Sequence, residues 1–168
     1  SAQSLYDGSS GALMNKITYE YDLSGEFLVN QGTPIQYTDV GYTTGRGNLC
    51  VVRRWDVNLP TDFNQSIQVS RTGYNTTGSP IFVRDALGHQ AAINYTDSFQ
   101  DAGSGATFAY PTTVTDADGF SSTSQYRRDI GAVTRTQDPK GAFQTTTYDS
   151  AGRVERIDIS NGAYRKFT

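Results

Sequence analysis

TTTYDSAGRVERI, residues 145–157, is the stretch of sequence that decides the fold. Its Thr, Tyr, Val and Ile residues suit the pleated, half-buried surface of a β-strand. Between its two halves, Asp149 can cap the backbone two residues further on, and Gly152 can supply the positive φ that closes a tight reversal. The segment therefore predicts a strand, a tight turn and a second strand.

The same turn pattern recurs along the chain in two types. The first has Tyr followed by Asp or Asn, with Gly three residues later: Tyr21-Asp22 with Gly25, Tyr74-Asn75 with Gly78, and Tyr148-Asp149 with Gly152, which Arg153 follows. The second type is Asp-x-x-Gly without Tyr, at Asp85 with Gly88, Asp116 with Gly119, and Asp138 with Gly141. We interpret the two types as turns at opposite borders of one sheet. Residues 129–131 are a degenerate member of the first type, and 30–32 and 161–162 belong with the second.

The turns are regularly spaced. Gly131 and Gly152 lie 21 positions apart, as do Gly141 and Gly162. Between turns, apolar and polar residues alternate with period 2, as on a strand, and no helical i, i+3, i+4, i+7 stripe is sustained. The sequence predicts an all-β fold: an antiparallel up-and-down meander of about twelve short strands in a curled sheet, either an open wall or a partial barrel.

One run of repeats is expected over the whole chain, residues 1–168. Gly-rich stretches near 38–48 and 97–109 interrupt the rhythm and predict two border-loop insertions at the Tyr-Asp border. A pair of stronger strands, 49–57 and 67–72, lies between them. We expect the terminal strands of the sheet near 12–21 and 154–159, where unpaired backbone groups favour self-association through the edges.

Composition excludes several classes of protein. Hydrophobic residues make up 36% of the chain, below the usual share of about 45–50%, which also counts glycine. A net charge of −3 gives no reason to expect nucleic acid as a partner. No apolar run approaches the roughly 18 residues of a membrane span. The start, residues 1–4, lacks a signal-peptide pattern and suggests an internal segment of a longer protein.

Chemistry-bearing residues are few. His89 is the single histidine and follows a turn glycine, so we expect a solvated turn residue. Cys50 is the single cysteine, lies in an apolar run and is expected to be a buried small side chain. Two arginine pairs, Arg53-Arg54 and Arg127-Arg128, are expected to project to solvent or to pair with nearby Asp residues. We therefore predict no catalytic residue, no metal ligand and no cofactor, and expect that the chain is not an enzyme.

These motifs together resemble the YD repeat of the RHS protein family. Tyr148-Asp149-x-x-Gly152-Arg153 fits the repeat signature in full, and Asp138-Pro139-x-Gly141 is similar to its alternate turn. The segment Gly45-Arg46-Gly47-Asn48, followed by Arg54-Trp55, is similar to segments inside bacterial members. Two departures stand out: no Arg follows Gly25 or Gly78, and nothing resembles the self-cleaving core that closes many such shells.

The resemblance implies a function. Members of this family wind their repeats into a hollow β-sheet shell, often around a C-terminal toxin, and teneurins use a related shell at the animal cell surface. It implies a non-enzymatic structural segment of a secreted or cell-surface shell, whose partners are neighbouring repeats and a toxin cargo. The alternative is a carbohydrate-binding or adhesive β-module that uses the Tyr-rich border loops.

Overall fold

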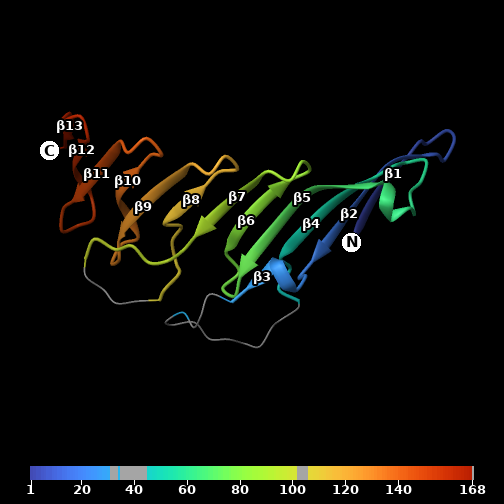
Figure 1. The fold of residues 1–168 in the computed structure, drawn as a ribbon, viewed down its shortest axis with the longest axis horizontal. Helices are drawn as coiled ribbons and strands as arrows, with labels where there is room; N and C mark the ends of the chain where they lie inside the picture. Colours follow the sequence, from blue (N-terminus) through green and yellow to red (C-terminus); the bar gives the residue numbers. More distant parts are fainter. Residues whose placement is uncertain (31–33, 35–44, 102–105, 168) are drawn as a thin grey trace. The chain divides into compact units, whose positions relative to one another are not determined.

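A computed structural model describes residues 1–30, 34, 45–101 and 106–167 (Figure 1). They form thirteen β-strands and two short 3-10 helices, η1 (Gly25–Phe27) and η2 (Phe63–Gln65). The chain divides into two compact units, of which the first holds nearly all described residues up to Ala91 and the second those from Ala92 on.

The first unit is a sheet with one crossover. Its strands are β1 (Ala2–Tyr6), β2 (Leu13–Tyr21), β3 (Leu28–Val29), β4 (Leu49–Trp55), β5 (Ser66–Asn75) and β6 (Pro80–Asp85). They follow the order β1-β2-β4-β5-β6 with antiparallel neighbours, and β3 pairs in parallel with β5. β4 and β5 therefore correspond to the two stronger strands expected at 49–57 and 67–72.

The second unit is a plain meander. β7 (Gln90–Asn94) pairs through Ala92, Ile93 and Asn94 with β8 (Thr113–Thr115). Then follow β9 (Ser121–Arg127), β10 (Ala132–Gln137), β11 (Phe143–Tyr148), β12 (Val154–Ile159) and β13 (Tyr164–Lys166), each antiparallel to the one before it. Taken along the chain, the strands form a thirteen-stranded meander sheet that is not closed, which confirms the predicted fold class.

The terminal strands are not those expected. β1 lies outside β2, and β13 lies outside β12, so residues 12–21 and 154–159 both occupy interior strands. The sequence concealed β1 because its turn has a different spacing: Asp7 is followed by Gly11 four residues later, and the N–H of Gly11 donates to the carbonyl of Asp7. Gly11 nevertheless has a φ of 68°, as the turn glycines do.

The hydrophobic core is small, as expected for a sheet whose two faces are both mildly polar. The buried hydrophobic side chains among the described residues are Cys50, Val51, Phe82, Tyr95 and Tyr126. The Phe82 ring fills the space over Gly73, where an added Cβ would lie 2.2 Å from the ring atom Cε1. Gly73 and Phe82 are direct cross-strand neighbours, so a glycine in mid-strand marks where an aromatic ring lies across the backbone.

Five hairpin turns that begin with Asp or Asn share one backbone pattern over five residues, which the turn at residues 159–163 also has. The N–H of the first residue donates to the carbonyl of the fifth, and the N–H of the glycine at the fourth position donates to the carbonyl of the first. The φ of that glycine lies between 78° at Gly152 and 92° at Gly88, as a three-residue hairpin loop ending in a bulge requires. The turns occupy residues 75–79, 85–89, 116–120, 138–142 and 149–153.

Replacing Gly152 by Ala should lower the free energy of unfolding by about 1 kcal/mol or more, because φ = 78° strains any L side chain. An added Cβ would meet only Ile130, at an ordinary 3.6 Å, so backbone strain is the expected cause. Urea melts measure the change. Gly8→Ala is the matched control, because Gly8 has no positive φ and open space around it. Equal stability of Gly152→Ala and the unsubstituted chain would contradict the turn geometry.

Candidate functional site

The side chain of the first residue closes each of the five turns. At 149–153, Asp149 Oδ1 accepts the backbone N–H groups of Ala151 and Arg153, both at 2.9 Å. The same two bonds, to the third and fifth residues, are made by Asn75, Asp85, Asp116 and Asp138. The repeat-turn residues singled out in the sequence, from Asn75 and Gly78 to Asp149 and Gly152, thus form self-contained caps.

The caps at Asp149 and Asp85 favour the charged carboxylate. The N–H of Arg153 is the main cause that lowers the pKa of Asp149, and the Arg153 side chain, 2.8 Å from Oδ2, adds to it. The pKa of Asp85 is also lowered, against the opposing effect of burial, by hydrogen bonds from the side chain and backbone of His89. The His89 ring is 64% exposed and lies 2.9 Å from Asp85, so it is a solvated turn residue.

Two Tyr residues that precede a turn hold the neighbouring strand. The Tyr148 hydroxyl donates to the carbonyl of Val133 at 2.8 Å, and that of Tyr74 donates to the carbonyl of Leu49 at 3.0 Å. Strand register shifts by one residue at each of these tyrosines. Burial raises the pKa of Tyr74, with a smaller contribution from Cys50, so its hydroxyl stays a donor. The Tyr in the repeat signature therefore ties a bulged strand end to its neighbour.

Tyr126 makes the same kind of contact before the degenerate turn. Its hydroxyl donates to the carbonyl of Pro111 at 2.7 Å, and its ring is buried. Its turn is built differently, because the N–H of Gly131 donates to the carbonyl of Arg127 four residues back. The Arg127 side chain pairs with Asp129 at 2.8 Å.

Tyr21-Asp22 is not a hairpin turn, and our expectation there was wrong. Strand β2 ends at Tyr21, which is 43% exposed, and the chain enters η1 at Gly25. Asp22, at φ = 52°, accepts the N–H groups of Gly45, Gly47 and Asn48, each at 3.0 Å. These bonds, chiefly the one from Gly47, lower the pKa of Asp22 despite partial desolvation. Asp22 thus anchors the end of the first insertion instead of reversing the chain.

Asp97 anchors the end of the second insertion, as Asp22 anchors the end of the first. Its carboxylate accepts the N–H of Thr107 at 2.7 Å and that of Phe108 at 3.1 Å, together with the Thr107 hydroxyl. No sequence pattern predicts this role, because the anchored backbone lies ten residues away across a Gly-rich stretch. Residues 38–44, 102–105 and the turn positions 31–32 lie outside the described residues.

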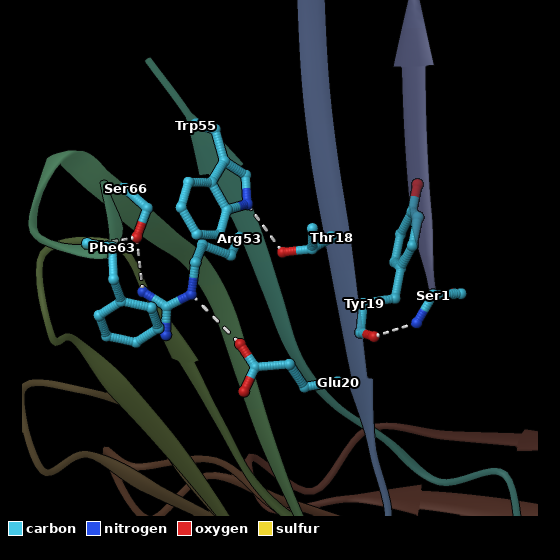
Figure 2. A network of polar contacts seen from close by, with 8 residues as sticks. All are labelled: Ser1, Thr18, Tyr19, Glu20, Arg53, Trp55, Phe63 and Ser66. Atoms are coloured by element: carbon cyan, nitrogen blue, oxygen red, sulfur yellow. Dashed lines mark hydrogen bonds and ion pairs between the residues drawn. The ribbon is translucent and has the colours of Figure 1, made fainter. Parts of the chain in front are cut away.

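A buried arginine organises one face of the first unit (Figure 2). Arg53 is 4% exposed, with Nε 3.2 Å from Glu20 and Nη1 3.0 Å from the Ser66 hydroxyl. The Phe63 ring covers it, with the guanidinium carbon 4.0 Å from the ring centroid. The expectation that Arg53 projects to solvent was wrong, because η2 folds Phe63 over it and β2 supplies a glutamate to neutralise it.

Trp55 extends the same network. Its Nε1 donates to the Thr18 hydroxyl at 2.9 Å, and Phe63 meets its ring edge-on (Figure 2). The Lys16 ammonium lies 4.4 Å from the centroid of the Trp55 ring. Phe27 with Phe82, and Tyr110 with Tyr126 and Phe99, are the other ring contacts of the described chain. The rings therefore pack against one another and against cations, which gives them a structural role.

The cysteine and the acidic residues of the described ranges form no further candidate site. Cys50 is 1% exposed, as expected, with Sγ 3.4 Å from the backbone of Leu23 and of Asn48. No cluster of three or more His, Cys, Asp or Glu residues that could hold a metal ion occurs there. Nor does that part of the chain contain a helix long and apolar enough to cross a membrane.

Comparison with known proteins gives a fold and no family. No family model matches the chain, and no curated protein does. In the crystal structure of TcdB2-TccC3-Cdc42, one chain is similar with a TM-score of 0.56 and 12% identity, over 93% of this chain and 8% of that one. In the crystal structure of TcdB2-TccC3-TEV, one chain is similar with a TM-score of 0.45 and 15% identity, over 99% of this chain and 8% of that one. The first similarity supports an RHS-like fold, and the chain spans less than a tenth of the structures it matches.

Asp149→Asn should make stability less dependent on pH in acid. An amide oxygen can accept the same two backbone bonds, as Asn75 does, but it has no proton to gain. A lowered folded-state pKa contributes stability above the unfolded value of about 3.9, and this stability is lost as the pH falls through the folded value. Urea melts between pH 6 and pH 2 measure the free energy of unfolding. At pH 6 it should be lower for the variant than for the unsubstituted chain, and the two values should converge in acid.

Asp118→Asn is the control for this experiment. It makes the same change of charge one residue before a turn glycine, but the Asp118 side chain makes no hydrogen bond within the described structure. It should leave the free energy of unfolding at pH 6 almost unchanged, because it removes no cap. If the difference in free energy of unfolding between Asp149→Asn and the unsubstituted chain did not change with pH, the role of the Asp149 carboxylate as the cap would be contradicted.

Proposed function

We propose that this chain is a structural segment of an RHS-type shell, a wall that encloses or presents a C-terminal toxin or effector outside the cell or at its surface. It acts without catalysis, and its partners are the repeats next to it. The observation that carries this proposal is the open sheet: β1 and β13 each have a neighbour on one side only. A wall of this kind is extended by strands added at both edges.

The backbone at β1 is arranged for such addition. Ser1 and Tyr19 exchange both backbone hydrogen bonds, at 2.9 and 2.8 Å. Because bonding alternates along an antiparallel strand, Gln3 points its backbone groups at β2, and Ala2 and Ser4 point theirs away from the sheet. All five residues of β1 are exposed. The N-terminal edge thus offers free donors and acceptors in strand register.

The C-terminal edge is shorter and more charged. β13 has three residues, all exposed, and two of them are Arg165 and Lys166. Short, positively charged edge strands discourage casual pairing. The two edges differ, so copies that pair through them join head to tail and form open chains instead of closed dimers.

The alternative of a carbohydrate-binding module at Tyr-rich border loops has less support. Tyr74, Tyr126 and Tyr148 use their hydroxyls to hold backbone carbonyls. Tyr42, in the first insertion, lies outside the described residues. These three tyrosines are thus engaged in the sheet itself, whereas Tyr21 is 43% exposed.

The isolated chain should self-associate as its concentration rises, through strand pairing at β1. Light scattering from micromolar to millimolar concentration should show a growing mean mass. Amide hydrogen exchange should slow at Ala2 and Ser4 over the same range, because their N–H groups become bonded. Ser4→Pro should suppress both effects, since it removes an outward N–H and leaves the bonds to β2 intact.

Gln3→Pro is the matched control, because it removes an inward N–H and should loosen β1 from β2. A strict monomer at all concentrations, with the amides of β1 exchanging freely, would argue against the wall. Association that Ser4→Pro does not change would place the contact elsewhere.

The chain should turn over no substrate. Cys50 is buried, and the exposed His89 is bound to a turn aspartate, so neither has the partner that nucleophilic catalysis requires. Panels of glycosidase, esterase and protease substrates provide the measurement. Turnover that is abolished by His89→Ala would overturn the non-enzymatic function.

A further inference from the structure

A polar hollow opens in the second unit, at the side of β9. The N–H of Ser124 donates to the carbonyl of Thr112, and the N–H of Tyr126 donates to that of Ser98. Two different segments of the chain therefore pair with alternate residues of one strand. The space between them measures ≈ 500 Å³, a size typical of small-ligand sites.

The lining of this hollow is unlike the rest of the surface. It consists of four Thr, two Ser, one Asn, one Gln and one Arg, and it contains neither an acidic nor an apolar side chain: Asn94, Thr96, Ser98, Thr112, Thr113, Thr123, Ser124, Gln125 and Arg135. Strand register places Thr113 beside Thr123, and Gln125 beside Arg135, on one face of the sheet. Four polar side chains thus converge there from three neighbouring strands.

Most of these polar groups are not used by the fold. The Thr112 hydroxyl donates to the carbonyls of Asn94 and Thr96 and so stiffens the rim. By contrast, the hydroxyls of Thr113 and Thr123 make no hydrogen bond within the described structure. The two amides of the lining already make one bond each, Gln125 to the carbonyl of Phe99 and Asn94 from the N–H of Thr96. A hydroxyl can both donate and accept, so the free hydroxyls match a ligand with many hydroxyls.

Arg135 gives the hollow its charge. The guanidinium carbon lies 4.0 Å from the centroid of the Phe143 ring, which holds the side chain in place. Its one hydrogen bond is a long 3.5 Å contact to Gln137, and it forms no ion pair with any described carboxylate. In a chain with more acidic than basic residues, a positioned and unneutralised guanidinium is ready to bind a carboxylate through both of its N–H groups.

We propose that this hollow binds an acidic sugar, a hexuronic acid unit of a glycan. Its carboxylate pairs with Arg135, and its ring hydroxyls bond to Thr113, Thr123 and Gln125. A neutral sugar would leave the cation unpaired, and a small inorganic anion would leave the hydroxyls unused. The site is distinct from the Tyr-rich border loops and does not depend on the function as a shell wall.

The test is a titration of the ¹⁵N-labelled chain with methyl glucuronide, followed by NMR. We expect shifts confined to the amides around the hollow, and binding about tenfold or more weaker for methyl glucoside, which lacks the carboxylate. Arg135→Gln should weaken the binding of methyl glucuronide to the level seen for methyl glucoside. Arg135→Lys should give an intermediate affinity, since it keeps the positive charge but loses the paired N–H groups of the guanidinium.

Thr113→Val tests the hydroxyl contacts separately, because it changes shape little and leaves Arg135 in place. It should weaken the glucuronide and the glucoside alike by a few fold. Arg165→Gln, on β13, is the control for loss of a positive charge and should leave binding unchanged. Acetate or inorganic phosphate binding as tightly as methyl glucuronide would overturn the proposal, as would shifts spread over the surface or absent altogether.

Discussion

The five-residue turn closed by an Asp or Asn side chain is the constraint on which the rest of this structure depends. Its oxygen satisfies two backbone N–H groups, and its glycine takes a backbone conformation that other residues avoid. Each turn is complete within itself and needs no support from a core. The chain can therefore keep a long meander in register even though few hydrophobic side chains are buried.

Cation–π contacts compensate for the small hydrophobic core. Six Lys or Arg side chains lie over aromatic rings within the described residues, whereas about one such contact per 70–80 residues is usual. Arg53 shows why this suits a thin sheet: its stem and guanidinium cover apolar surface, and Glu20 and Ser66 satisfy its donors. Such contacts stabilise a face without requiring a second layer to pack against it.

Local features were predictable from sequence, and features made by distant segments were not. The turns at Asp85, Asp138 and Asp149 follow from five consecutive residues, so their pattern is sufficient. Asp22 has the same sequence signature, yet it binds backbone more than twenty residues away, because η1 diverts the chain. The burial of Arg53 and the polar hollow likewise depend on which strands become neighbours, and single-sequence periodicity carries no such information.

The one crossover in the first unit has a consequence for how the chain folds. Most neighbouring strands are joined by turns of a few residues, and such hairpins form within microseconds at little entropic cost. β2 and β4 are different, because 27 residues separate Tyr21 from Leu49 and β3 must also find β5 in parallel. By topology, closing that long connection is slower than forming a hairpin. The hairpins from β9 onward can form independently of it, so the last repeats of the segment can be in place before the first ones are.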